Sequence, residues 1–208
     1  LDRIGREGAR LTNCFVATPV CSASRAALIC GRYPTEVGIT DYLSPSQMPG
    51  VGLDPSLPVW PRILADAGYR TALVGKWHLG KEDRFHPTKF GYGEFTGFRH
   101  GGMTSQNPLV EINGTERRVE GWTPDILTDH ALDFIARNRD GGPFCLSLHF
   151  WAPHANAHKI DGDRTWLPLS EADFGPFRDL DPQVPNADFP RRDIPRVKRR
   201  TREYLGSI

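Results

Sequence analysis

Two segments of helical periodicity are each followed by a short apolar run, and this order of elements is the strongest constraint on the fold. Val59 to Ala67 carries apolar residues on one helical face, and Tyr69 to Val74 then alternates as a strand. Thr123, as an N-cap, opens a second helix with Pro124 in its first turn, and Phe144 to Phe150 follows as an apolar strand. Helices that alternate with short strands predict an α/β fold, in which helices flank a sheet.

The other segments predict shorter or less regular structure. We expect a helix over Ser22 to Cys30, a strand or buried connector over Leu11 to Val16, and loops over Thr40 to Pro58 and beyond Lys159. Lys81 to Glu120 lacks clear periodicity and predicts a long irregular excursion, with a hairpin at Asn113-Gly114 because that dipeptide favours a tight turn.

Both ends of the chain have the pattern of a helix that is already under way. Leu1 and Ile4 stand three residues apart with charges between them, and Arg199 to Ile208 has no capping Gly or Pro after it. A length of 208 residues suits one domain. We therefore expect residues 1–208 to be part of a single domain, truncated at both ends.

Composition excludes several classes of protein. Twenty-six basic and 25 acidic residues give a net charge of +1, which does not indicate a polyanion partner. The basic stretch Arg191 to Ile208 lacks the interleaved aromatic residues of a nucleic-acid groove and is interpreted as a solvated face. No apolar run approaches the roughly 18 residues of a membrane helix. The four cysteines form no zinc or disulfide pattern, so each is expected to be a small buried residue by default.

Chemistry-bearing residues gather after the two strands and at the start of the first internal helix. Ligands of open α/β sheets bind beyond the carboxyl ends of strands, where Lys76, His78 and His154 stand in this sequence. Cys21 begins a helix whose free N–H groups favour an anion, and Arg25 lies one turn further on the same face. Taken singly, these residues also fit a buried capping cysteine, a surface lysine beside a packed tryptophan, and a structural histidine.

Together the motifs resemble those of the sulfatase family, within the alkaline phosphatase superfamily. Its Cys-x-Ala-x-Arg signature stands at Cys21 to Arg25, followed by Gly-Arg-Tyr-Pro at residues 31–34. Gly-Lys-Trp-His-Leu-Gly occupies residues 75–80, and Ala-Pro-His occupies residues 152–154. The resemblance implies a sulfatase or alkaline-phosphatase-like mixed sheet, and it makes residues 1–208 a partial N-terminal catalytic domain.

The resemblance also implies a role for each motif residue. Cys21 would be oxidised to formylglycine by a maturation enzyme, and the hydrate of that aldehyde would be the nucleophile and a ligand of a divalent cation, usually Ca²⁺. Arg25 would stabilise the nucleophile, and Lys76 would hold a sulfate oxygen. His154 would donate a proton to the departing alcohol, and His78 would take a proton from the second hydroxyl to expel sulfate.

The cation's other ligands are acidic residues that the family places outside the segment matched here. Asp41, Asp161 and Asp163 stand in contexts that do not match those ligands. We rate His149 as strand packing, His158 as a weaker candidate for substrate contact, and Tyr33, Trp77 and Trp151 as packing around the site. The expected substrate is a sulfated small molecule or polysaccharide, and export from the cytoplasm is expected by resemblance.

Two alternatives stay open on the sequence. A phosphonate or phosphate monoester hydrolase of the same superfamily would use the same nucleophile. A catalytically inert relative or fragment would keep the architecture and leave Cys21 as a thiol.

Overall fold

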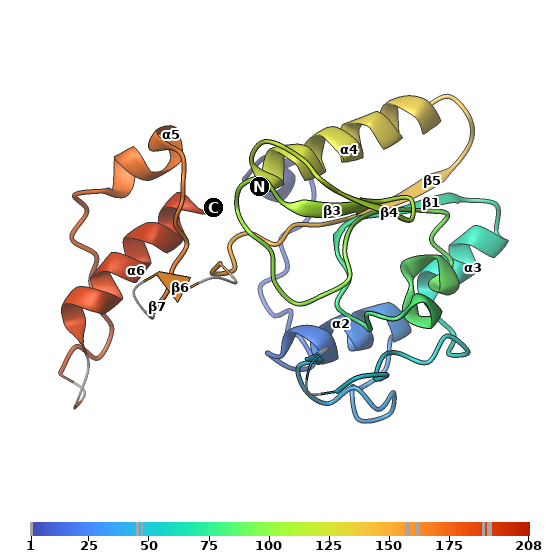
Figure 1. The fold of residues 1–208 in the computed structure, drawn as a ribbon, viewed down its shortest axis with the longest axis horizontal. Helices are drawn as coiled ribbons and strands as arrows, with labels where there is room; N and C mark the ends of the chain where they lie inside the picture. The colour runs from blue at the N-terminus through green and yellow to red at the C-terminus, as the bar shows by residue number, and fades with distance from the viewer. Residues whose placement is uncertain are drawn as a thin grey trace.

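A five-stranded mixed sheet is the centre of the structure (Figure 1), a computed structural model that describes residues 2–44, 46, 48–156, 159–160, 163–188, 190 and 193–208. The strand order is β4-β3-β2-β1-β5. β1 pairs in parallel with both β2 and β5, whereas β2, β3 and β4 are joined in antiparallel fashion. The strands are β1 Arg70–Lys76, β2 Glu94–Phe98, β3 Leu109–Ile112, β4 Thr115–Arg118 and β5 Phe144–His149.

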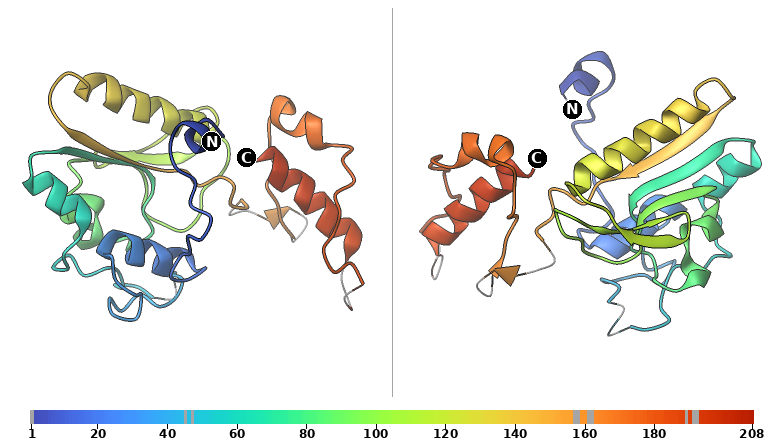
Figure 2. Two further views of the ribbon diagram at one scale, coloured as in Figure 1. Left: turned by 180° about the vertical axis from the view of Figure 1, so that it is seen from behind. Right: turned by 45° about the horizontal axis from the view of Figure 1, so that its top comes forward.

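Helices cover both faces of this sheet. The long helix α4 (Thr123–Asn138) lies along one face, and α2 (Cys21–Cys30) and α3 (Trp60–Asp66) lie on the other (Figures 1 and 2). α2 ends where expected, because Gly31 takes a left-handed conformation with φ of 63° that residues with a side chain disfavour. The α/β architecture predicted from the alternation of elements is therefore confirmed.

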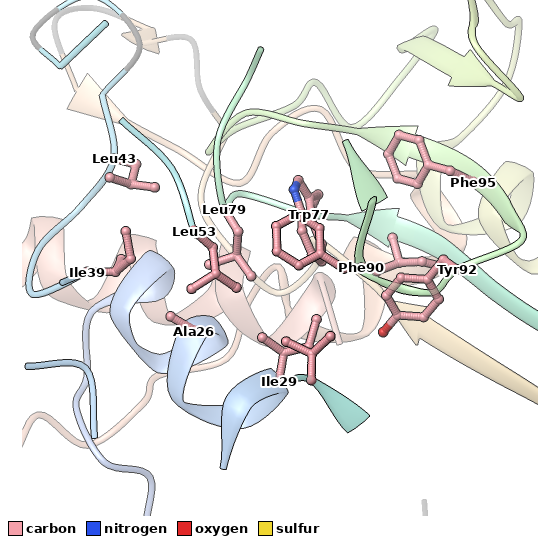
Figure 3. Close-up of a cluster of buried hydrophobic side chains, with 12 residues drawn as sticks. Ala26, Ile29, Ile39, Leu43, Leu53, Trp77, Leu79, Phe90, Tyr92 and Phe95 are labelled. Atoms are coloured by element: carbon pink, nitrogen blue, oxygen red, sulfur yellow. The ribbon is translucent and has the colours of Figure 1, made fainter. Parts of the chain in front are cut away.

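The main hydrophobic core lies between the sheet and the α2 face. Trp77 packs at its centre, with ring centroids 5.1 Å from Phe90 and 6.3 Å from Tyr92 (Figure 3). The Trp77 indole donates a hydrogen bond to the Phe85 carbonyl at 2.7 Å, so this large side chain is both buried and satisfied. Further members of the core are Ala26, Ile29, Ile39, Leu43, Leu53, Val59, Leu73, Leu79 and Phe95.

The segment between Lys81 and Glu120 is more ordered than predicted. The hairpin at Asn113-Gly114 is confirmed, since β3 and β4 pair on either side of it. The expectation of irregular structure was wrong for β2, which is a buried interior strand of the sheet. A parallel strand buried on both faces has no polar alternation. Its five residues are flanked by a glycine-rich sequence that obscures so short a run.

The amino-terminal segment also differs from expectation. The helix is present as α1 (Asp2–Glu7), but none of its residues is buried. Leu11 to Val16 was expected to form a strand or buried connector, and this was wrong: the segment has no regular structure, and Leu11, Phe15 and Val16 are exposed. Apolar residues alone do not bury a segment unless an element packs over it.

Three local expectations need correction. Thr123 is the first residue of α4 and not its N-cap, since Trp122 takes that position and the Thr123 hydroxyl donates to the Thr104 carbonyl at 2.7 Å. Ile63 of α3 is exposed although it was assigned to the apolar face. The region beyond Lys159 is not only loop, because it contains β6 Lys159–Ile160, β7 Asp163–Arg164, α5 Glu171–Phe174 and α6 Ile194–Gly206.

Three short 3₁₀ turns complete the structure: η1 Asp83–Phe85, η2 Pro87–Phe90 and η3 Gly175–Phe177. α5, η3 and α6 pack together beside the main body (Figures 1 and 2). The Ser105 hydroxyl, which donates to the Pro168 carbonyl at 3.0 Å, links this unit to the loop that follows β2. Among the described helices, none is both long and apolar enough to cross a membrane.

Candidate active site

The carboxyl end of β1 and the first turn of α2 bring four of the five predicted site residues together. Lys76 is the last residue of β1 and His78 follows two residues later, while Cys21 and Arg25 occupy the first turns of α2. Burial lowers the pKa values of Arg25, Lys76 and His78; the charge of Cys21 opposes this lowering at Arg25 and Lys76, and the charge of Lys76 adds to it at His78. The four groups therefore interact electrostatically in one small region.

Arg25 is held at this junction by the backbone of β1. Its Nη1 donates to the Lys76 carbonyl at 2.7 Å. Burial lowers the pKa of Arg25, and the nearby Cys21 opposes that shift. The guanidinium remains a cation at physiological pH, because the ordinary arginine pKa lies above 12. α2 thus presents a fixed positive charge next to Cys21.

Lys76 supplies a second cation to this region, and its side chain is buried. Its side chain is 3% exposed, and its Nζ donates to the Gly101 carbonyl at 2.7 Å. Burial, together with the positive charge of Arg25, lowers the pKa of Lys76 to about 8, while the charge of Cys21 acts in the opposite direction. Two cations repel one another in a partly desolvated region, so an anion bound between them would be stabilised.

His78 is a neutral base with one free ring nitrogen. Its Nε2 lies 3.0 Å from the Leu43 carbonyl, which only accepts hydrogen bonds, so the proton of the neutral ring is assigned to Nε2. Nδ1 is buried and has no hydrogen-bond partner among the residues that the structure describes. Burial and the charge of Lys76 lower the pKa of His78 to about 4. An unprotonated, unpartnered nitrogen in such a position can accept a proton from a bound group.

The backbone around His78 also shows that this position is constrained. His78 has a φ of 60°, which is uncommon for a residue with a side chain. A Cβ added to Gly101 would lie 2.6 Å from the His78 ring, so glycine is required there for the imidazole to fit. The Tyr42 ring packs edge-on against it at 4.9 Å between centroids.

His154 is the fifth predicted site residue and follows the end of β5 by five residues. It lies on the exposed loop after β5, where its Nδ1 donates to the neighbouring Ala155 carbonyl at 2.8 Å and its ring stacks on Trp151 at 5.7 Å. Among the described hydrogen bonds and ion pairs, none joins His154 to Cys21, Arg25, Lys76 or His78.

Two further histidines belong to this region and were missed as site residues. His149 was rated as strand packing, yet its Nδ1 lies 3.2 Å from the Lys76 carbonyl and 3.4 Å from Arg25 Nη1. His100 follows β2, and its charge contributes to the lowered pKa of His78. A signal for His149 was available, because it ends the strand that pairs with β1 and so falls at the same sheet edge. His100 stands in the segment that was predicted as irregular, so no signal placed it.

The surrounding predictions have mixed outcomes. Trp77 and Trp151 are buried and pack as expected, but Tyr33 is 69% exposed, so packing was wrong for it. Cys14 is exposed and the other three cysteines are half-buried, whereas all four were expected to be buried. His158 and Asp161 lie outside the described residues.

The acidic and cysteine residues were tested as a cation site. Ca²⁺ takes six to eight oxygen ligands. No group of three or more His, Cys, Asp or Glu residues able to hold a metal ion is found in the part of the chain that the structure describes. Asp41 is exposed and is not part of such a group. Cys21 stands between cations rather than carboxylates, so the described residues do not by themselves fit Ca²⁺.

The fold and the site together define an α/β protein that places a buried and a half-buried cation, a free imidazole nitrogen and a cysteine at the carboxyl edge of its sheet. Such a site fits a tetrahedral oxyanion. The chain belongs to the sulfatase family, whose family model, described as Sulfatase, matches residues 1–207. Structural similarity to solved relatives confirms the expected sulfatase-type fold.

Two relatives of known name are sulfatases of acetylated amino sugars. It is 32% identical over 156 residues to the N-acetylglucosamine-6-O-sulfatase of Bacteroides thetaiotaomicron, covering 75% of this chain and 26% of that protein. It is 32% identical over 196 residues to the human N-acetylgalactosamine-6-sulfatase, covering 82% of this chain and 37% of that protein. The chain thus spans about a third or less of the length of these two relatives.

Two similar solved structures each contain a bound ligand. Ps i-CgsB in complex with k-i-k-neocarrahexaose superposes with a TM-score of 0.73 at 26% identity, over 92% of this chain and 42% of that one. BT4656, in complex with its substrate D-glucosamine-2-N,6-O-disulfate, superposes with a TM-score of 0.71 at 28% identity, over 89% of this chain and 33% of that one.

Proposed function

We propose that the protein containing this chain hydrolyses sulfate esters and that residues 1–208 form the amino-terminal part of its catalytic domain. The observation that carries the proposal is the pairing of half-buried Arg25 and buried Lys76 near Cys21, with the free Nδ1 of His78 nearby. Names of relatives that act on 6-sulfated amino sugars support a sulfated sugar as the substrate.

Cys21 is the proposed site of oxidation to formylglycine by a maturation enzyme. Its half-buried position at the start of α2 fits this role, because the helix terminus and the two cations favour negative charge there. Formylglycine supplies, as its hydrate, one hydroxyl to attack sulfur and a second through which the sulfated enzyme can collapse. The requirement for a cation is proposed from the family.

The remaining residues bind the sulfate group and move protons. Arg25 and Lys76 hold the oxygens on which negative charge develops and are already desolvated, so little reorganisation accompanies the reaction. His154 is the proposed proton donor to the departing alcohol, and its exposed loop is open to an incoming substrate. His78 accepts a proton at Nδ1 when the second hydroxyl expels sulfate.

Release of inorganic sulfate from N-acetylglucosamine 6-sulfate tests this proposal. In the full-length protein, Lys76→Ala is expected to lower kcat/KM by about 10²-fold or more, since it removes a preorganised cation. Lys89→Ala is the matched control, because that lysine is exposed and lies in η2, outside the motif.

Unchanged sulfate release by Lys76→Ala would contradict the proposal. Faster turnover of the corresponding phosphate ester than of the sulfate ester would instead favour the phosphohydrolase alternative.

A further inference from the structure

His149 stands where three strands approach one another unusually closely. Gly97, Gly75 and His149 form one row across β2, β1 and β5. A Cβ on Gly75 would lie 2.0 Å from the His149 carbonyl oxygen, and a Cβ on Gly97 would lie 1.9 Å from the Gly75 oxygen. The two glycines therefore allow the end of β5 to pack directly against the backbone that leads into Lys76.

The His149 ring shares its hydrogen-bond acceptor with Arg25. The Lys76 carbonyl lies 3.2 Å from His149 Nδ1 and 2.7 Å from Arg25 Nη1. A carbonyl oxygen has two lone pairs and can accept from both donors, which assigns the neutral ring's proton to Nδ1. The imidazole and the guanidinium are then held in contact, 3.4 Å apart, by one backbone oxygen.

The surroundings leave these two side chains little freedom. Arg25 and His149 line a small hollow of about 20 Å³, whose other walls are Trp60, Trp77, Tyr92, Leu79 and aliphatic side chains of α2. Burial and the charge of Arg25 lower the pKa of His149 to about 4, so the ring is neutral near pH 7. A neutral donor satisfies the carbonyl without adding a third cation beside Arg25 and Lys76.

We propose that His149 is a positioning residue, which fixes the Arg25 guanidinium and the Lys76 backbone in the geometry that binds the sulfate group. The inference deepens the proposed function and rests on it for the identity of the anion. His149 itself does not touch the reacting atoms. Its contribution is to hold a carbonyl that would otherwise depend on Arg25 alone.

Two substitutions in the full-length protein separate positioning from simple packing. His149→Asn keeps an amide N–H near the place of Nδ1, whereas His149→Leu keeps volume and removes the donor. We expect His149→Leu to weaken binding of inorganic sulfate about tenfold, as for loss of one hydrogen bond to the site. His149→Asn is expected to restore most of that affinity. His130→Leu on α4 is the matched control and is expected to bind sulfate like the wild type.

A second readout does not depend on sulfate chemistry. In ¹⁵N-edited NMR spectra, the guanidinium protons of Arg25, assigned by their loss in Arg25→Lys, are expected to exchange slowly in the wild type and in His149→Asn. They are expected to exchange faster in His149→Leu.

The outcomes distinguish the two proposals. Slow Arg25 exchange and unchanged sulfate affinity in His149→Leu would overturn the positioning role. Equal loss in His149→Asn and His149→Leu would also overturn it, since packing alone would then explain the effect. The positioning role would be supported if the Arg25 guanidinium protons exchange faster in His149→Leu but not in His149→Asn. If the wild-type protein also releases no sulfate from the ester, the proposed function fails while the positioning role stands.

Discussion

His78 shows how burial of a single side chain couples stability to pH. It is 1% exposed, and burial together with Lys76 lowers its pKa from 6.5 to about 4. The unfolded chain therefore binds a proton at a higher pH than the folded protein does. The stability from this group is fully present above pH 6.5 and is lost as the pH falls through about 4.

We predict that His78→Asn reduces the acid sensitivity of the fold. Asparagine tolerates the positive φ at this position but does not titrate. When the pH falls from above 6.5 to below 4, the shift in the pKa of His78 lowers the free energy of unfolding by about 3 kcal/mol in total. Urea unfolding at pH 7 and pH 4.5 should show a smaller fall in the free energy of unfolding for His78→Asn than for the wild type. Equal falls in the two proteins would contradict this explanation.

The same residues predict the pH dependence of turnover. As a proton acceptor His78 must be neutral, so kcat/KM is expected to rise with pH through about 4. As a cation Lys76 must be protonated, so kcat/KM is expected to fall as the pH rises through about 8. Initial rates of sulfate release between pH 3.5 and pH 10 check both limbs, with Lys89→Ala as control. A rate that stays constant up to pH 10 would remove Lys76 from this role.

At the scale of elements, the site depends on how closely β1 approaches β5. Gly75 has a φ of 116°, and a Cβ there would meet the His149 carbonyl oxygen at 2.0 Å. Because the oxygen belongs to the backbone of β5 and a Cβ is bonded directly to the backbone of β1, neither can move without shifting a strand. Gly75 is thus a structural requirement of the motif that contains Lys76 and His78.

We predict that Gly75→Ala lowers the free energy of unfolding by about 3 kcal/mol or more, since it combines a forced clash with an unfavourable φ. Gly31→Ala is the matched control, because Gly31 also has a positive φ but nothing lies within 4 Å of its added Cβ. The control is expected to cost about 1 kcal/mol. Urea unfolding measures both, and equal losses in the two variants would show that the close approach has no special cost.

Elements with a clear period and clear ends could be predicted from the sequence. The helix ending at Gly31, the helix after Val59 and the strands after Gly68 and Gly142 all form near their predicted places. β2 could not be predicted, because a five-residue parallel strand has no alternation. The exposure of Leu11 to Val16 could not be predicted either, since burial depends on what packs over a segment.

The candidate site was predictable where motif residues are close in sequence or follow a strand. The proximity of Cys21, Arg25, Lys76 and His78 agrees with their predicted grouping, although their catalytic roles stay predictions. The shared carbonyl that joins Arg25 to His149 could not be predicted, because it involves the backbone of a residue 51 positions from one partner and 73 from the other.

At the scale of the whole molecule, the charged side chains of the site are positive. Arg25 and Lys76 face Cys21, and among the described residues no acidic group gathers there to hold a metal ion. β5 is an edge of the described sheet, and Leu148 and Phe150 at its carboxyl end are partly exposed. The chain covers 42% and 33% of two solved relatives.

The mass of the Cys21 peptide, measured in full-length protein from its native host together with sulfate release, tests the central claim most directly. Conversion of the thiol to formylglycine lowers the peptide mass by about 18 Da. We expect that loss in active protein, and we expect Cys21→Ala to abolish turnover while the fold is retained. An unmodified Cys21 thiol in protein that releases sulfate at full rate, or full activity in Cys21→Ala, would contradict the account.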